Sequence, residues 1–242
     1  VVDTVKQLSV AAHVGRDQLQ NPQNIINELA AKTQILIRKL GYTSVSGQST
    51  DTVFSVEPMG LSAASKIKSG QSTTAGSNQY GSALSLTMFD TLYNKVRPLA
   101  KPTFFLAHSD VETKYLQLLR TDGGGVDSAM LQLANFGTPQ LTVKGVPFLV
   151  SDFIPKTEYT LDQTASCPGG GSGTANSTSI YAVYSNALDG WGGFLNGTDA
   201  IQVIGPIDVA GQSYVEYQCV VRLGLSLRNA LAVGVLRSVT GT

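Results

Sequence analysis

The spacing of hydrophobic and polar residues at the start of the chain predicts a strand followed by a long helix. Residues 4–14 alternate as in a half-buried strand. Between residues 24 and 41 apolar residues recur every three or four positions instead, as in an amphipathic helix of about five turns. Asn21-Pro22 would begin this helix, and Gly41 could adopt the left-handed conformation that ends it.

The same pattern predicts two shorter helices around a buried strand in the middle of the chain. Apolar residues share one face of a predicted helix over residues 85–96. Residues 103–108 form a short apolar run and predict a strand. A second helix is expected over residues 109–120, with Ser109 as its N-cap and Glu112 as the other member of a capping box.

The second half of the chain predicts mainly strands separated by glycine-rich breaks. Lys144-Gly145 joins two apolar runs and predicts a tight hairpin. A brief helix is expected over residues 127–135, a turn at Gly224, and irregular structure over residues 43–82 and 162–178. The strand-like runs are residues 140–143, 146–150, 180–184, 201–204, 214–223 and 230–236. Helices and strands mix without a regular β-α-β order, which indicates the α+β class.

The balance of charge argues against a dedicated nucleic-acid-binding protein. The chain has 17 Lys and Arg and 17 Asp and Glu, whereas binding to phosphates needs a basic surplus. Only 14% of its residues are charged, against roughly 25% in typical domains. Such a surface tends to associate unless neighbouring subunits cover it; a neutral extracellular β-protein is the alternative. No apolar stretch reaches the roughly 20 residues of a membrane-spanning helix.

One candidate nucleophile is Ser65, which begins a Ser-x-x-Lys sequence ending at Lys68. Penicillin-binding enzymes place this motif at the start of a helix and a Lys-Thr-Gly far along the chain. Here the faint second match, Lys68-Ser69-Gly70, overlaps the first within a polar loop. We therefore keep a serine hydrolase using Ser65 only as an unfavoured alternative.

The other candidate groups favour structural roles. His13 and His108 are the only histidines, and no Cys or Glu pattern accompanies them. The stretch 122–127 lacks the Lys-Ser/Thr that follows the glycines of a phosphate-binding loop. Cys167 and Cys219 are too few for a disulfide framework. We predict no catalytic, cofactor-binding or metal-binding residues, no cofactor and no enzymatic activity.

The roles of three further features stay open. Trp191 lies beside glycines and could anchor a loop onto a core or form part of a binding site. Arg222, Arg228 and Arg237 could face packaged DNA, solvent or a neighbouring subunit. Asn196 begins a formal glycosylation sequon, to which we give little weight.

The order of several segments resembles the major capsid proteins of tailed bacteriophages. Residues 24–41, followed by Met59-Gly60-Leu61, are similar to the spine helix of that family and the turn after it. Residues 102–120 are similar to its buried strand and amphipathic helix. The stretch 136–155 is similar to its segment of strand, Gly-hydrophobic-Pro, strand, acidic residue and Pro. Residues 179–236 follow the family's closing order of strand, glycine-rich loop, long strand, Arg-Asn-Ala corner and final strand.

This resemblance implies the α+β capsid fold that is named after a Hong Kong phage and shared with encapsulins. Residues 1–14 would be the returning strand of an extended loop. A peripheral domain would comprise residues 15–80, which include the spine helix, and residues 206–242. An axial domain over residues 81–205 would point towards the centre of each pentamer or hexamer.

The resemblance also implies a function in assembly. The chain would be a structural subunit that self-assembles into the icosahedral head shell enclosing the viral genome, located in the virion after assembly in the bacterial cytoplasm. Its partners would be copies of itself in pentamers and hexamers, with portal, scaffold or decoration proteins as further candidates. Packaged DNA would be contacted weakly and nonspecifically at most, and no membrane would be involved. An encapsulin-type shell of a bacterial nanocompartment is the alternative.

Overall fold

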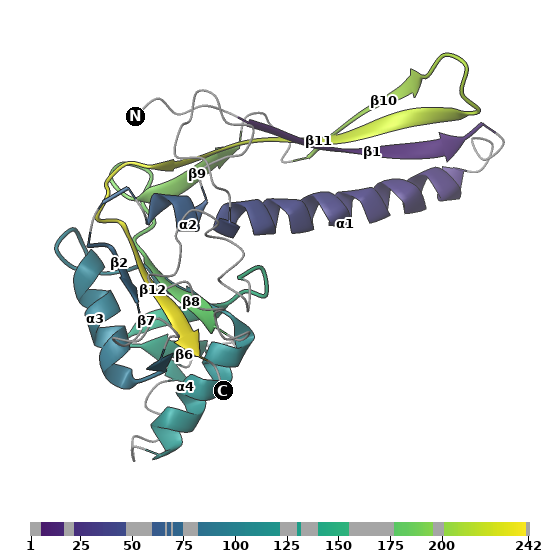
Figure 1. Ribbon diagram of the computed structural model, residues 1–242. Coiled ribbons are helices and arrows are strands. Elements are labelled where there is room, and N and C mark those ends of the chain that lie inside the picture. The colour runs from purple at the N-terminus through teal and green to yellow at the C-terminus, as the bar shows by residue number, and fades with distance from the viewer. Residues whose placement is uncertain are drawn as a thin grey trace, which may run out of the picture. The chain divides into compact units, whose positions relative to one another are not determined.

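The computed structural model divides the chain into two compact units (Figure 1). Unit 1 comprises Val1–Gly60 and Gly193–Ser226, and unit 2 comprises Leu61–Gly192 and Leu227–Thr242. Both contain helices and strands, which confirms the α+β class. The residues that the structure describes are 6–16, 22–46, 60–65, 67–68, 70–74, 82–121, 130–131, 140–154, 177–195 and 201–240.

Unit 1 is built on a four-stranded sheet. At its centre β11 (Tyr214–Leu227) pairs antiparallel with β1 (Lys6–Gly15) on one side and with β10 (Gln202–Asp208) on the other. The short strand β9 (Trp191–Leu195) also pairs with β11. β1 confirms the strand predicted at the start of the chain, and β10 lies at an edge of the sheet.

β11 continues through Gly224, so the turn predicted there is wrong. Gly224 lies beside β9, where a Cβ on Gly193 would be only 3.4 Å from the Gly224 carbonyl oxygen and 2.9 Å from a Leu225 methyl. The lack of a side chain at Gly193 thus permits a close approach of the two strands, and the chain bends only later. At Asn229 the side chain accepts the Leu231 N–H at 3.0 Å and forms the predicted corner.

Helix α1 (Pro22–Ser46) packs beside β1 in unit 1 (Figure 1). Leu36 is the most buried residue of α1, at 1% exposed. The prediction that Gly41 ends this helix is wrong. The hydroxyls of Thr43 and Ser44 donate to carbonyls one turn earlier, at 2.7 and 2.8 Å, and lie in a helix that continues past the glycine.

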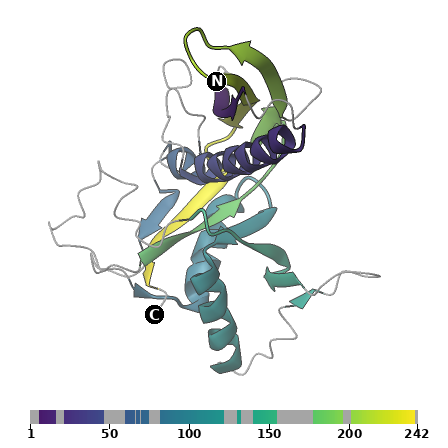
Figure 2. The ribbon, with the colours of Figure 1, turned by 90° about the vertical axis from the view of Figure 1, so that its right-hand side faces the viewer.

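Unit 2 contains an eight-stranded mixed sheet (Figures 1 and 2). Its strands in spatial order are β2 (Ser72–Thr74), β12 (Val233–Thr240), β8 (Ser177–Val183), β4 (Phe104–Ala107), β7 (Val146–Val150), β6 (Gln140–Val143) and β5 (Met130–Leu131), with β3 (Ser82–Ala83) also paired to β12. Because β2 and β12 pair although most of the sequence lies between them, the sheet joins distant parts of the chain. β4 confirms the buried strand predicted in the middle of the chain.

The helices α3 (Leu86–Val96) and α4 (Ser109–Thr121) pack on this sheet and form the core of unit 2. Phe89 of α3 is 1% exposed, and its ring centroid lies 4.9 Å from Tyr115 of α4 and 6.0 Å from Phe105 of β4. Such aromatic pairs stabilise a core beyond the area that they bury. Both helices were predicted. A further one-turn helix, α2 (Leu61–Ala64), is fully buried.

Helix α4 begins one residue away from its predicted cap. The carbonyl oxygen of His108 accepts the N–H groups of Val111 at 3.0 Å and Glu112 at 3.4 Å, so His108 is the N-cap. Its imidazole Nδ1 accepts the backbone N–H of Asp110 at 3.1 Å. The capping box predicted for Ser109 and Glu112 is therefore wrong, because Ser109 is already inside the helix.

The hairpin of β6 and β7 is confirmed. Lys144 and Gly145 have φ angles of 52° and 67°, as a primed two-residue turn requires. The brief helix predicted over 127–135 is wrong at residues 130 and 131, since these pair with β6 as β5. The remainder of that prediction and nearly all of the predicted loop at 162–178 lie outside the described residues.

The boundaries of the two compact units differ from the domain boundaries that the resemblance implied. In particular, β12 pairs with β8 and belongs to unit 2, whereas residues 206–242 were expected to form one part of the peripheral domain. The partners of a strand cannot be read from its own sequence, and they decide which unit contains it. The assignment of peripheral and axial domains within a shell stays a prediction.

Candidate functional site

Ser65 has a structural environment. Its side chain is fully buried, and its hydroxyl donates to the carbonyl oxygen of Ser62 at 2.8 Å. Its backbone N–H closes the last turn of α2 by donating to Leu61 at 3.0 Å. A hydroxyl that is buried and donates to a helix carbonyl lacks the arrangement of a nucleophile beside a general base. Lys68 is exposed, so the Ser-x-x-Lys match does not lie in a buried helix.

His108 lies between two carboxylates in unit 2. Its side chain is 6% exposed, with Nδ1 3.6 Å from Asp110 Oδ2 and Nε2 3.6 Å from Asp152 Oδ1. Because Nδ1 accepts the backbone N–H of Asp110, the neutral ring carries its proton on Nε2, facing Asp152. The arrangement therefore holds the start of α4 next to the end of β7.

His13 belongs to a polar network on the sheet of unit 1. Its Nε2 lies 3.6 Å from Glu216 Oε2, and its ring stacks on Tyr214 with 4.4 Å between centroids. Gln218 donates to the other oxygen of Glu216 at 2.7 Å. The two contacts of His13 cross from β1 to β11, and the hydrogen bond between Gln218 and Glu216 lies within β11. In the part of the chain that the structure describes, no group of three His, Cys, Asp or Glu residues could hold a metal ion.

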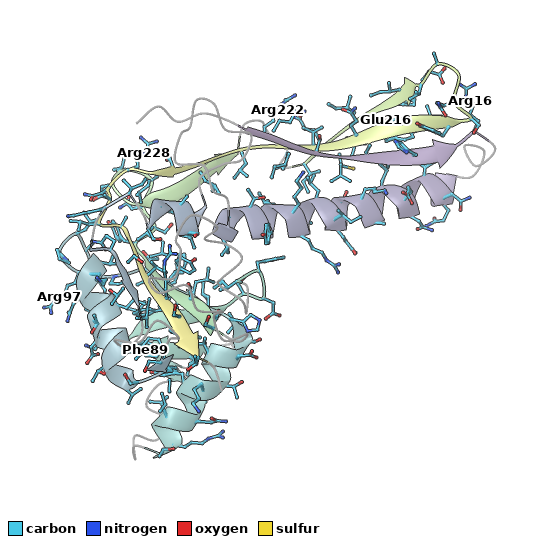
Figure 3. All side chains as sticks on the ribbon, viewed as in Figure 1. Arg16, Phe89, Arg97, Glu216, Arg222 and Arg228 are labelled. Atoms are coloured by element: carbon cyan, nitrogen blue, oxygen red, sulfur yellow. The ribbon has the colours of Figure 1, made fainter. Side chains whose placement is uncertain are left out.

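The three arginines singled out in the sequence belong to different elements. Arg222 of β11 donates to Gln202 Oε1 at 3.3 Å, so it joins two strands of unit 1 (Figure 3). Arg228 is exposed at the corner after β11, where its backbone N–H donates to the carbonyl oxygen of Gly190, and Arg237 is half-buried in β12. A contact between these arginines and DNA stays a prediction.

Trp191 closes a tightly hydrogen-bonded loop in unit 2. The backbone N–H of Trp191 donates to the backbone carbonyl oxygen of Tyr184 at 2.9 Å, and Asn186 donates to the Tyr184 hydroxyl at 2.8 Å. Gly190 has no room for a side chain, because a Cβ would lie 2.4 Å from Asn186 N. At the tip of this loop Leu188 is 85% exposed.

Several candidate residues lie outside the described ranges. These are Asn196, Cys167 and the stretch 122–127. Cys219 is described: its thiol is free and buried, and it lies 3.9 Å from the Thr33 hydroxyl of α1. None of the described helices has both the length and the apolar character to span a membrane.

The surface shows apolar residues that sequence reasoning did not single out. In unit 1 they lie on β10, where Val203, Ile204 and Ile207 are 51%, 40% and 37% exposed, and on the flanks of α1. On α1, Ile26 and Ile37 belong to the helical spacing of apolar residues, yet they are 56% and 51% exposed. What distinguishes these residues is their exposure to water. The spacing of apolar residues along the sequence does not show which of them will be exposed.

Solved structures of shell proteins share this fold over nearly the whole chain, although no protein-family model and no curated protein sequence matches it. A holo encapsulin complex from Synechococcus elongatus PCC 7942 has a TM-score of 0.72 at 19% identity, covering 98% of this chain and 75% of that chain. The capsid of cyanophage A-1(L) has a TM-score of 0.61 at 13% identity, covering 97% and 77%. The capsid of an empty GTA particle has a TM-score of 0.60 at 15% identity, covering 99% and 75%. The chain therefore has the capsid fold that its sequence resembled.

Proposed function

We propose that the chain is a structural subunit that assembles with copies of itself into an icosahedral shell, and that this shell is the head of a tailed bacteriophage. The observation that carries the proposal is the match of 97% of the chain to a phage capsid subunit with a TM-score of 0.61. In such a shell the subunit would be located in the virion, and the shell would enclose the viral genome.

The chemistry of the surface supports assembly. Only 14% of the residues are charged, while large apolar side chains such as Ile26, Val203 and Leu188 are more than half exposed. Contiguous apolar surface on a soluble monomer is a liability, whereas contacts with other copies remove it from water. Each contact between subunits can be weak, because a closed shell adds many of them.

The shell of a bacterial compartment is the second candidate. Of the three structures described above, the encapsulin has the highest TM-score, 0.72, against 0.61 for the cyanophage capsid. Both candidates use the same fold and the same kind of self-assembly, so they differ in what the shell contains. A phage head contains nucleic acid, and an encapsulin shell contains protein cargo.

Within this function we assign no catalytic step to the chain. Ser65, the one candidate nucleophile, donates its hydroxyl proton to a helix carbonyl and is buried. Portal, scaffold and decoration proteins remain candidate partners, and Arg228 is an exposed basic group that could contact packaged DNA weakly.

Electron microscopy of the full-length protein, purified from its natural source, tests the proposal. We expect hollow shells of uniform size with icosahedral symmetry. Nuclease-protected nucleic acid inside them would identify a phage head, and protein cargo without nucleic acid would identify a compartment shell. A preparation that contains only monomers or dimers under native conditions would contradict both candidates.

A further inference from the structure

The edge strand β10 exposes large apolar side chains to water. Val203 is 51% exposed, Ile204 40% and Ile207 37%. Exposed edge strands usually carry charged side chains, which discourage association. From Gln202 to Ile207, however, β10 has no charged residue. These features are those of a surface that another chain covers.

One face of the hairpin formed by β10 and β11 carries an apolar ridge. Ile204 pairs with Gln218 and Ile207 pairs with Glu216 across the two strands. Paired residues share a face of a sheet, and Gln218 and Glu216 are two positions apart on β11, so both isoleucines project on the same side. We call Ile204 and Ile207 the ridge.

The opposite face of the same hairpin is hollowed by an open cleft of about 430 Å³. Val215 and Tyr217 lie in it and alternate along β11 with the partners of the ridge, so they face the other side. Pro206 adds a third apolar surface. At the rim Arg16 donates to Asp208 at 2.9 Å (Arg16 is labelled in Figure 3). We call this hollow the cleft.

The cleft suits an uncharged apolar group. Among the described residues that line it, the two charged ones, Arg16 and Asp208, form an ion pair with each other, and the other three are apolar or aromatic. A charged ligand would have to compete with that ion pair. Aliphatic side chains would instead bury the surfaces of Tyr217 and Pro206 above the already buried Val215, which is favourable because it removes apolar area from water.

We propose that the ridge of one copy of this chain packs into the cleft of the next copy, so that successive hairpins join head to tail around an axis. The inference rests on the proposed function, which supplies the second copy. Ridge and cleft lie on opposite faces of one hairpin, so each copy can offer its ridge to one neighbour and receive the ridge of another. Such a heterologous contact closes into a ring when the rotation between copies allows it.

The contact is made by side chains and not by addition of a strand. Pro206 has no N–H group to donate to a neighbouring strand, and the pairing of β10 shifts register between Ile204 and Ile207. Both features interrupt a continuous ladder of hydrogen bonds along the outer edge of β10. Packing of the ridge into the cleft needs no such ladder.

Disulfide cross-linking between two different variants tests the proposal. Chains with Ile204→Cys are mixed with chains with Tyr217→Cys, assembled into particles, oxidised mildly and separated on a non-reducing gel. Two cysteines can bridge only when their Cα atoms lie within about 7 Å. We expect linked dimers as the main product of the mixture, and only the background of the natural cysteines when either variant is assembled alone.

If Tyr217→Cys does not fold, Asp208→Cys replaces it, because the Asp208 side chain is 81% exposed at the rim.

A matched control is Val150→Cys, which is 40% exposed as Ile204 is but lies in unit 2. Mixed with the cleft variant, it should give no linked dimer. Links in particles of Ile204→Cys alone would show a symmetric contact and overturn the proposal. Particles that form without links in the mixture would also overturn it, while leaving the proposed function intact. A wild-type chain that forms no particles would contradict the proposed function itself.

Discussion

The two units of the chain bury their apolar residues to different degrees. Unit 2 packs two helices on an eight-stranded sheet, and 16 buried residues among those described form a core cluster that lies entirely in this unit. Unit 1 places one helix beside a four-stranded sheet (Figure 1). Among the described residues, seven large apolar residues of the smaller unit 1 are exposed, against five of unit 2; those of unit 1 are Ile26, Ile35, Ile37, Tyr42, Val203, Ile204 and Ile207.

This difference indicates a division of roles. Unit 2 has a well-packed core, in which aromatic rings meet between the sheet and the helices. Unit 1 leaves on its surface the kind of residues that other proteins bury. In a shell, that surface would be covered by neighbouring subunits, so unit 1 would gain from assembly much of the burial that unit 2 has in the isolated chain.

The largest effect is expected for Phe89→Ala in unit 2. Phe89 is 1% exposed and touches the rings of Phe105, Tyr115 and Phe148. Removing such a ring costs about 3–5 kcal/mol of the free energy of unfolding. Urea unfolding of dissociated subunits, followed by the fluorescence of Trp191, measures the loss. Phe153→Ala, at a site 37% exposed, is the control and should cost much less; equal losses would mean that unit 2 has no dominant core.

A neighbouring pair on α1 tests how much of unit 1 is buried within the subunit. Leu36 is 1% exposed and Ile37 is 51% exposed. Leu36→Ala should lower the free energy of unfolding by about 2–5 kcal/mol. Ile37→Ala should change it by about 0.5 kcal/mol or less, as expected for surface positions. A large loss for Ile37→Ala in dissociated subunits would contradict the exposed flank of α1.

The sequence predicted most elements of both units, because their helices and strands have clear periods and turn residues. The hairpin at Lys144-Gly145 is one case, since its turn type needs residues that accept positive φ. Errors arose where a local signal competed with distant contacts. Gly41 was expected to end α1 and Gly224 to form a turn, yet the first lies within a continuing helix and the second within a paired strand.

The candidate site could be predicted only in part. That the chain has the capsid fold followed from the order of its segments. The ridge and the cleft could not be predicted from the sequence. Only the pairing of β10 with β11 places Ile204 and Tyr217 on opposite faces of the same hairpin. The strand predicted over 201–204 gave no sign that its apolar residues would stay exposed.

A smaller effect, confined to unit 2, is expected for Tyr115→Phe. The Tyr115 hydroxyl donates to the carbonyl oxygen of Thr142 at 3.1 Å, and such a hydrogen bond contributes about 1 kcal/mol. Burial raises the pKa of Tyr115 above its usual 10.0. The unfolded chain therefore loses this proton first, so the contribution to stability is complete below about pH 10 and is lost as the pH rises through the raised pKa.

Urea unfolding of the wild type and of Tyr115→Phe between pH 8 and about pH 11 measures this loss. Burial also lowers the pKa of Lys95, which acts in the opposite direction in the same range, so only the difference between the two proteins isolates Tyr115. The wild type should lose its advantage over Tyr115→Phe as the pH rises. An advantage that stays constant would contradict the buried hydroxyl.

The smallest effect is expected for Arg16→Ala at the tip of unit 1. The side chains of Arg16 and Asp208 are 53% and 81% exposed, so water and salt screen their ion pair. The free energy of unfolding of the dissociated subunit should fall by about 0–1 kcal/mol, with less change at high salt. Denaturation at low and high ionic strength measures it. A loss as large as that of Leu36→Ala would mean that the rim of the cleft is part of a core.

Hydrogen–deuterium exchange of assembled particles and dissociated subunits tests most directly whether assembly covers unit 1. Peptides from β10 and from β8 serve for the comparison, since β10 is an exposed edge strand and β8 is a buried central strand. We predict that exchange in β10 slows markedly on assembly, while β8 exchanges slowly in both states. Equal exchange of β10 in particles and in dissociated subunits would contradict the account, as would the absence of particles.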